Sequence, residues 1–186
     1  IIPQSETKII EGLGRYYAKH NPGINVLIPS IDRAKAIVVL TRGRYAYSDN
    51  IDLREQVYDF PSQNVITKDN IQMEINALLY FQIVDPFKAV YEISNLPNAI
   101  EKLTQTTLRN IIGDLELDQT LTSRETINTK MRASLDVATD PWGIKVTRVE
   151  LKNIIPPAEI QNAMERQMKA ERERREAVTR AEGEKK

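Results

Sequence analysis

The chain has 186 residues and a mass of 21.3 kDa, with 26 basic and 26 acidic side chains, a single His and no Cys. Its zero net charge argues against a dedicated nucleic-acid binder, which would carry an excess of Lys and Arg on one face. The lack of Cys excludes disulfides, thiolate zinc sites and a Cys nucleophile. A hydrophobic content of 41% is enough for a core, and the length suits one domain or two small ones.

Charge density divides the chain into two regions. The segment 158–186 holds 15 of the 52 charged side chains, 7 acidic and 8 basic, and no aromatic residue follows Trp142. The sequence has no apolar run of 18 residues, which is about the length that spans a bilayer. It begins at Ile1-Ile2-Pro3 without an initiator Met and stops within a charged helical pattern, so we expect it to be a piece of a longer protein.

The first half of the chain has a hydrophobic period close to two, which is typical of β-strands. Asn21-Pro22-Gly23 predicts a turn before an apolar run at 24–28. A hairpin is predicted over 37–47, with Thr41-Arg42-Gly43-Arg44 as its turn. The clearest strand is 71–84, where apolar and polar residues alternate. We therefore expect an antiparallel sheet.

Beyond Asp85 the period changes to 3.6, which is typical of amphipathic helices. Asp85 followed by Pro86 predicts a short capped helix to about residue 93. A second helix is predicted over 97–112, with Gly113 as its stop. A third is predicted from a capping box at Thr122-Ser123-Arg124-Glu125 to about residue 139. The apolar face expected of the second helix comprises Ala99, Ile100, Leu103, Thr107, Leu108, Ile111 and Ile112.

A last strand is predicted over 144–153, and its apolar residues change face between Val146 and Val149. One extra residue at a β-bulge near Thr147-Arg148 explains that change.

Pro156-Pro157 predicts the start of a final helix, along which the apolar positions thin out to Ala and Val. Its charged pairs at i,i+4 are of opposite sign, for example Glu165 with Lys169, and such pairs support an exposed helix. We expect an arm that projects from the domain for roughly 45 Å, at about 1.5 Å per residue.

Motifs for catalysis or metal binding are weak. No Ser or Asp at a suggestive spacing accompanies His20, which favours an ordinary surface His. Gly12-Leu13-Gly14 lacks the rest of a phosphate loop and favours a bend or bulge in a strand. Asp114, Glu116 and Asp118 lack the loop Gly and the final Glu of a calcium site, which favours solvated charges after a helix. We expect no catalytic residue, metal or cofactor; the alternative is a hydrolase whose acids meet only in three dimensions.

Two further features allow more than one interpretation. Arg172, Arg174 and Arg175 alternate with Glu, which favours a solvated, salt-bridged helix face over a nucleic-acid stripe. The pairs Tyr16/Tyr17 and Tyr45/Tyr47 fit either anchors at a membrane surface or strand residues packed on a sheet.

Several segments together resemble the stomatin-like branch of the stomatin/prohibitin/flotillin superfamily, also called SPFH or band 7. The similarity covers nearly the whole chain, and no single match carries it. Its segments, in chain order, are Leu13-Gly14-Arg15-Tyr16, Pro22-Gly23-Ile24-Asn25, Ile28-Pro29-Ser30-Ile31-Asp32-Arg33, Val65-Ile66-Thr67-Lys68-Asp69-Asn70, Leu103-Thr104-Gln105-Thr106-Thr107-Leu108-Arg109-Asn110 with Gly113, Ser123-Arg124-Glu125, Trp142 to Lys152, Pro156-Pro157, Glu171-Arg172 and Ala181-Glu182-Gly183-Glu184.

The resemblance implies an α+β fold, with a strongly twisted antiparallel sheet, packed helices and a C-terminal coiled-coil helix. It divides the chain into a membrane-proximal β-rich part at 1–60, an α+β core at 61–155 and the start of the coiled-coil arm at 156–186. It also implies a non-catalytic scaffold that an N-terminal segment, absent from this chain, anchors to a membrane. Such scaffolds organise membrane microdomains and regulate membrane proteases or channels.

The partners expected from the resemblance are further copies of the chain or a paralogue in a large oligomer, membrane lipid, and a membrane protease or channel, with no nucleic acid. One departure from the family is the longer link between Arg33 and Asp52, which we interpret as a contact with a neighbouring subunit or with lipid. The residues expected near the membrane are Ile1, Ile2, Tyr16, Tyr17, Leu27 and Ile28. Those expected to join copies along the arm are Met164, Met168, Ala170, Arg172, Arg174, Arg175, Glu176 and Ala177.

Overall fold

A three-stranded antiparallel sheet forms the centre of the computed structural model, which describes the whole chain except residues 1, 3, 13–14, 26–31, 42–43 and 185–186. Its strands are β7 (Gln56–Ile66), β8 (Gln72–Ile83) and β9 (Ile144–Ile155), in the order β7-β8-β9. The alternation expected for 71–84 is confirmed, because every second residue of β8 from Met73 to Ile83 is buried.

The sheet contains three irregularities in its pairing. Tyr80 pairs with Arg148 and Phe81 with Val146, so Thr147 is the extra residue and the expected bulge is confirmed. A second bulge, which the pattern did not indicate, leaves Lys152 extra between Leu151 and Asn153. The third shifts the register of β7 between Phe60 and Gln63.

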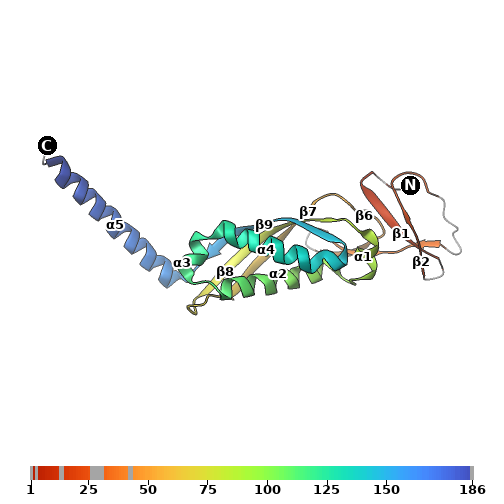
Figure 1. Ribbon diagram of the computed structural model, residues 1–186, viewed down its shortest axis with the longest axis horizontal. Coiled ribbons are helices and arrows are strands. Elements are labelled where there is room, and N and C mark those ends of the chain that lie inside the picture. The colour runs from red at the N-terminus through yellow and green to blue at the C-terminus, as the bar shows by residue number, and fades with distance from the viewer. Residues whose placement is uncertain (1, 3, 13–14, 26–31, 42–43, 185–186) are drawn as a thin grey trace.

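Helices cover one face of this sheet (Figure 1). The helices that pack on the sheet are α2 (Leu96–Gly113), on β7, and α4 (Arg124–Thr139), on β9. The shorter α1 (Pro86–Tyr91) contacts the N-terminal strand Glu6–Gly12, α3 (Leu117–Thr122) contacts α4, and a 3₁₀ turn at Asp140–Trp142 follows α4. The cap expected at Asp85 is confirmed, since its carboxylate accepts the backbone N–H of Lys88 at 3.3 Å. The core joins the sheet to α2 and α4 through fully buried side chains such as Ile100, Leu108, Ile127 and Met131.

Two helix boundaries differ from the prediction. Gly113 is the last residue of α2, with no left-handed φ, rather than a stop outside it. The capping box at Thr122–Glu125 is wrong, because the Ser123 side chain makes no capping bond. The Thr122 hydroxyl instead donates to the Asp118 carbonyl inside α3, a helix absent from the prediction.

The N-terminal part is built from short strands: β1 (Glu6–Gly12), β2 (Arg15–His20), β3 (Asp32–Ala34) and β6 (Ile51–Asp52). β1 pairs antiparallel with the other three. The expected hairpin is confirmed as β4 (Ile37–Thr41) and β5 (Arg44–Ser48), which pair with each other. Of the apolar run at 24–28, Ile24 and Asn25 lie outside any strand, and 26–28 are not among the described residues.

The N-terminal strands share the core of the central sheet, because Ile9, Ile37 and Ile51 belong to the same buried cluster as Phe81. The division expected between residues 60 and 61 falls inside β7. At the other end, α5 (Ala158–Glu184) leaves the domain after Pro156-Pro157, as expected, so the N-terminal strands and the arm lie at opposite ends of the molecule (Figure 1).

Candidate interaction surfaces

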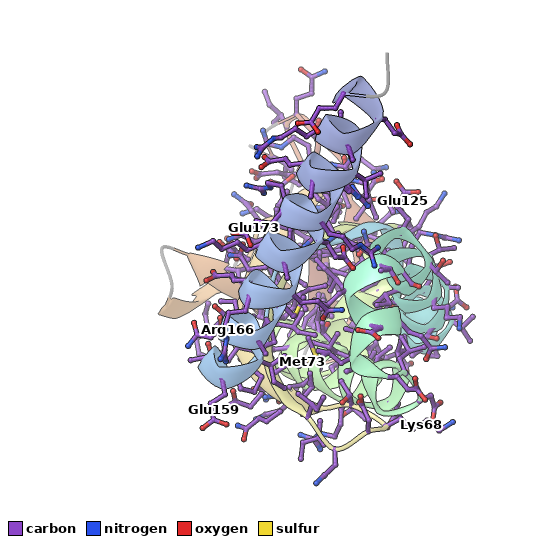
Figure 2. The ribbon with its side chains drawn as sticks, turned by 90° about the vertical axis from the view of Figure 1, so that its left-hand side faces the viewer. Lys68, Met73, Glu125, Glu159, Arg166 and Glu173 are labelled. Carbon is purple, nitrogen blue, oxygen red and sulfur yellow. The ribbon has the colours of Figure 1, made fainter. Side chains whose placement is uncertain are left out.

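The arm is a single helix of 27 residues with no buried residue. At about 1.5 Å per residue it is roughly 40 Å long. Ile160 packs partly against the core, whereas every residue from Glu165 to Glu184 is exposed. Figure 2 shows Glu159, Arg166 and Glu173, which are seven residues apart, projecting from one side of α5 into open space. Among the residues that the structure describes, the arm therefore packs on no other part of its own chain beyond its first turns.

The residues expected to join copies all lie on this helix. Met164 is half-buried near its base, and the other seven are exposed. Met168 retains 59% of its surface, which is high for a large apolar side chain. Ala163, Ala170 and Ala177 share the seven-residue spacing of a coiled-coil position, and Ile160, Gln167, Arg174 and Ala181 supply the companion position. The coiled coil and the assembly remain predictions, because each needs a second copy.

Tyr16 contributes to an aromatic cluster between the N-terminal strands and α1. Its ring centroid lies 4.6 Å from that of Phe87 and 6.1 Å from that of Tyr91, both edge-on. Burial, followed by the nearby Glu11 carboxylate, raises the pKa of Tyr91 to about 12. Tyr16 remains 47% exposed, so it packs on a neighbouring element and still offers one edge to a partner.

Of the other residues expected near the membrane, one is buried and the side chains of the rest are not described. Ile2 is only 5% exposed and exchanges two backbone hydrogen bonds with Gly23, so its side chain has no free surface in a single molecule. Ile1, Leu27 and Ile28 are not among the described residues, and neither is the side chain of Tyr17.

Among the described residues before β7, Ile24 and Tyr47 are exposed and were absent from that set. Ile24 is 83% exposed and Tyr47 is 81% exposed. The sequence signal for Ile24 is its place in an apolar run after a Pro-Gly turn, and that pattern does not mark a surface residue. Tyr47 was one of the tyrosines with two interpretations, and its exposure favours a surface role over packing.

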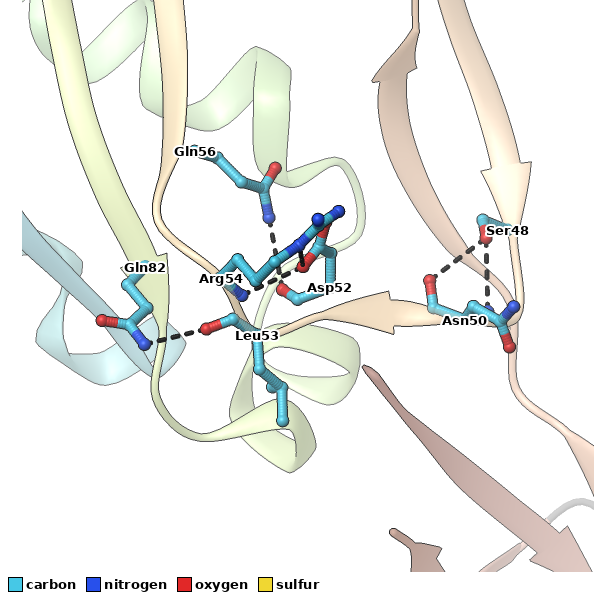
Figure 3. Close-up of polar contacts among 7 residues, drawn as sticks. All are labelled: Ser48, Asn50, Asp52, Leu53, Arg54, Gln56 and Gln82. Atoms are coloured by element: carbon cyan, nitrogen blue, oxygen red, sulfur yellow. Dashed lines mark hydrogen bonds and ion pairs between the residues drawn. The ribbon is translucent and has the colours of Figure 1, made fainter. Parts of the chain in front are cut away.

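The connection between the N-terminal strands and the central sheet is held by local hydrogen bonds (Figure 3). Arg54 donates to both carboxylate oxygens of Asp52, at 3.0 and 2.9 Å, and its bond keeps the pKa of that carboxyl below the usual range. Gln82 on β8 donates to the Leu53 carbonyl at 2.8 Å, and Gln56 donates to the Asp52 carbonyl at 3.3 Å. These bonds tie residues 52–56 to the end of the sheet.

The candidates for chemistry are dispersed. His20 ends β2, and its carbonyl accepts a hydrogen bond from the Thr7 hydroxyl at 2.7 Å. Asp114, Glu116 and Asp118 are all exposed, and the Glu116 backbone N–H is bound by the Gln119 side chain at 2.9 Å. Across the described residues, no three His, Asp or Glu side chains are grouped as metal ligands. Within the same part of the chain, no helix has the length and apolarity needed to cross a membrane.

Comparison with known proteins assigns the family. The chain is 44% identical over 184 residues to a stomatin homolog of Pyrococcus horikoshii, covering 99% of this chain and 64% of that protein. It is 48% identical over 183 residues to an uncharacterized protein of Mycobacterium tuberculosis, covering 98% of this chain and 45% of the other. An uncharacterized protein of Methanocaldococcus jannaschii is 44% identical over 185 residues, covering all of this chain and 86% of its own length.

The chain thus spans about half the length of several curated relatives it matches. The sequence profile described as "SPFH domain / Band 7 family" matches residues 1–185, which confirms the resemblance drawn from the motifs. The mixed fold of antiparallel sheets and helices is consistent with that profile. The chain belongs to the SPFH domain / Band 7 family.

Proposed function

We propose that this chain is the repeating unit of a non-catalytic scaffold at a membrane surface. In this proposal the arm joins copies into a large assembly, and the N-terminal strands face the lipid. The assembly organises membrane microdomains and regulates membrane proteins such as proteases or channels. Membership of the family supports the membrane scaffold role, and two features of the molecule support the arrangement.

The main support for the proposal is the arm, because it is a long helix that packs on no other helix in the described structure. Beyond its first turns this helix is polar nearly all round and packs on no core in the described structure, whereas helices in proteins are stabilised mainly by packing. Ala163, Ala170 and Ala177 form one small-residue line along it, where a second helix can approach closely. Charges that flank this line can pair between copies and set their register.

The second supporting feature is the placement of the two ends. The exposed Ile24 and Tyr47 lie in the N-terminal part, and α5 leaves from the opposite end (Figure 1). Apolar and Tyr side chains are favoured at a membrane–water interface. If the N-terminal strands face the bilayer, the arm points away from it and can meet arms of neighbouring copies.

Charged substitutions in the small-residue line test the assembly. We expect Ala170→Asp with Ala177→Asp to reduce the full-length protein to small species in sedimentation, while its circular dichroism retains the domain's signal. Each new carboxylate would lose its water in the contact between helices. Thr179→Asp is the control, since it adds a carboxylate on the opposite side of the helix. An unchanged assembly in the double variant contradicts a role for this line.

The lack of Cys allows a clean test of orientation. A single Cys in place of Ile24, Tyr47 or Val178 accepts an environment-sensitive fluorophore without a competing thiol from these 186 residues, once any Cys elsewhere in the full-length protein has been replaced by Ser. In membranes containing the full-length protein, we expect blue-shifted emission at positions 24 and 47 and an aqueous spectrum at position 178 on the arm. Blue-shifted emission at position 178, with aqueous spectra at positions 24 and 47, would show that the arm and not the N-terminal strands faces the membrane.

A further inference from the structure

Basic side chains outnumber acidic ones in the N-terminal strands, although the whole chain is neutral. Residues 1–48, which end with β5, contain seven basic and three acidic side chains. Residues 49–157, which form the central sheet and its helices, contain 11 basic and 16 acidic side chains. The zero net charge therefore combines a positive N-terminal part with a negative central part.

Two of the seven basic groups form ion pairs that the structure describes. Lys8 Nζ lies 3.1 Å from a carboxylate oxygen of Asp49, and Lys35 Nζ lies 3.6 Å from a carboxylate oxygen of Glu11. The other five basic residues are Arg15, Lys19, Arg33, Arg42 and Arg44. Two acidic residues remain in this part to offset them, so an excess of three positive charges is left after these pairs are set aside.

Four of these five positions lie on described strands. Arg15 and Lys19 belong to β2 and Arg33 to β3, and the Lys19 side chain is exposed. Arg44 begins β5 at the far end of the hairpin, four residues along the ladder from the buried Ile37 at its base. That separation is roughly 13 Å at about 3.3 Å per residue, so Arg44 is held away from the core.

The distribution of charge along the molecule favours one way of meeting a negative surface. The N-terminal strands lie at the end opposite the arm, with the negative central part between them (Figure 1). A bilayer with anionic lipid attracts Lys and Arg within a screening length of its surface and repels a region with excess Asp and Glu. Contact through the N-terminal end is therefore favoured over contact along the side of the domain.

We propose that the basic N-terminal strands bind the surface of a bilayer that contains anionic lipid. The Arg and Lys side chains would contact headgroup phosphates, and the exposed Ile24 and Tyr47 would insert at the level of the headgroups, where apolar and Tyr side chains are favoured. This inference rests on the proposed function, because it names the class of lipid that these strands face.

Cosedimentation of the 186-residue chain with lipid vesicles tests this proposal. Vesicles of phosphatidylglycerol and phosphatidylcholine in equal amounts should bind the chain, and vesicles of phosphatidylcholine alone should bind it at least about tenfold more weakly. Raising the NaCl concentration from about 0.1 M to about 1 M shortens the screening length from about 10 Å to about 3 Å. The higher salt concentration should therefore release the chain from the anionic vesicles.

Two double variants with the same net charge show whether the position of the charges matters. Lys19→Gln with Arg44→Gln should weaken binding to the anionic vesicles about 25-fold, at about fivefold per basic residue. Lys102→Gln with Lys130→Gln is the matched control, because both residues are exposed on the helices of the central part. The control should bind within about twofold of the parent, because these residues lie beyond the screening length from the lipid. A circular dichroism melt like that of the parent shows that each variant is folded.

Equal binding to the two kinds of vesicle, equal losses in the two double variants, or no binding to either vesicle overturns this inference. Release of the bound chain by single-stranded DNA, at the same concentration of phosphate groups as the lipid, would assign the basic strands to nucleic acid and also overturn it. The proposed function keeps its own test, because blue-shifted emission at positions 24 and 47 shows membrane contact whatever the charge of the lipid.

Discussion

Gly143 is, among the glycines whose surroundings the structure describes, the one where an added methyl group should damage the domain most. It lies between the 3₁₀ turn and β9 with φ +69, in the left-handed region. Its carbonyl accepts the backbone N–H groups of Val84 and Asp85, at 2.8 and 3.0 Å, and so joins the end of β8 to the start of β9. We predict that Gly143→Ala strongly lowers the free energy of unfolding.

The magnitude follows from two separate costs. A left-handed conformation costs a residue with a Cβ atom about 1–2 kcal/mol. A Cβ atom at position 143 would also lie 2.3 Å from the carbonyl oxygen of Asp85 and 2.8 Å from its Cβ. That carbonyl is fixed because it accepts the Ala89 N–H in the first turn of α1, and overpacking of this kind costs about 1–3 kcal/mol. The sum is about 2–5 kcal/mol.

Urea unfolding followed by the fluorescence of Trp142, the single Trp of the chain, measures this difference. Gly183→Ala is the control, because a Cβ atom at that position of α5 would meet nothing within 4 Å. It should raise the helicity of the arm and leave the Trp142 transition unchanged. A loss below about 0.5 kcal/mol for Gly143→Ala, which is the range of ordinary surface substitutions, would refute the reasoning.

Three further predictions concern the core, the arm and one carboxylate. Leu135→Ala should lower the free energy of unfolding in urea by about 2–5 kcal/mol, because the Leu135 side chain is fully buried on α4. Val137→Ala is the control, because Val137 is 77% exposed, and it should lower that free energy by less than about 0.5 kcal/mol. Deletion of residues 165–186 should leave the Trp142 transition unchanged, since residues 165–184 are all exposed, and a shifted midpoint would show that the arm contacts the domain. The Thr67 hydroxyl, and then backbone N–H groups including that of Leu117, hold the pKa of Asp69 below its usual value. Because folding favours the ionised form, this contribution is present above about pH 4 and is lost as the pH falls through the lowered pKa of the folded state. Asp69→Asn should therefore destabilise the protein at pH 7 and have a smaller effect near pH 2, and equal effects at both pH values would contradict it.

Features that depend on neighbouring residues could be predicted from the sequence. The alternation along β8, the hairpin at 37–47 and the Asp85-Pro86 helix start are each contained in a few consecutive residues. The bulge at Thr147 could be predicted for the same reason, because an extra residue changes which face the following apolar side chains occupy.

Other features depend on contacts between distant segments or on very short elements. The six residues of α3 complete less than two turns, too few for a helical period to be visible. Tyr16 packs on α1, and nothing in its own strand indicates which element it will meet. A cavity between β6, the β4–β5 hairpin and the end of β8 forms only because these segments converge, so no motif marks it.

Direct imaging of the full-length protein in its own membrane tests the central claim most directly. Electron microscopy of membranes that contain it should show closed assemblies of many copies, with the N-terminal strands against the lipid and the arms joined to one another away from it. The Ala170→Asp, Ala177→Asp variant should lack these assemblies under the same conditions. Single, separate copies of the parent protein, or copies that touch through the domain with their arms free, would contradict the account.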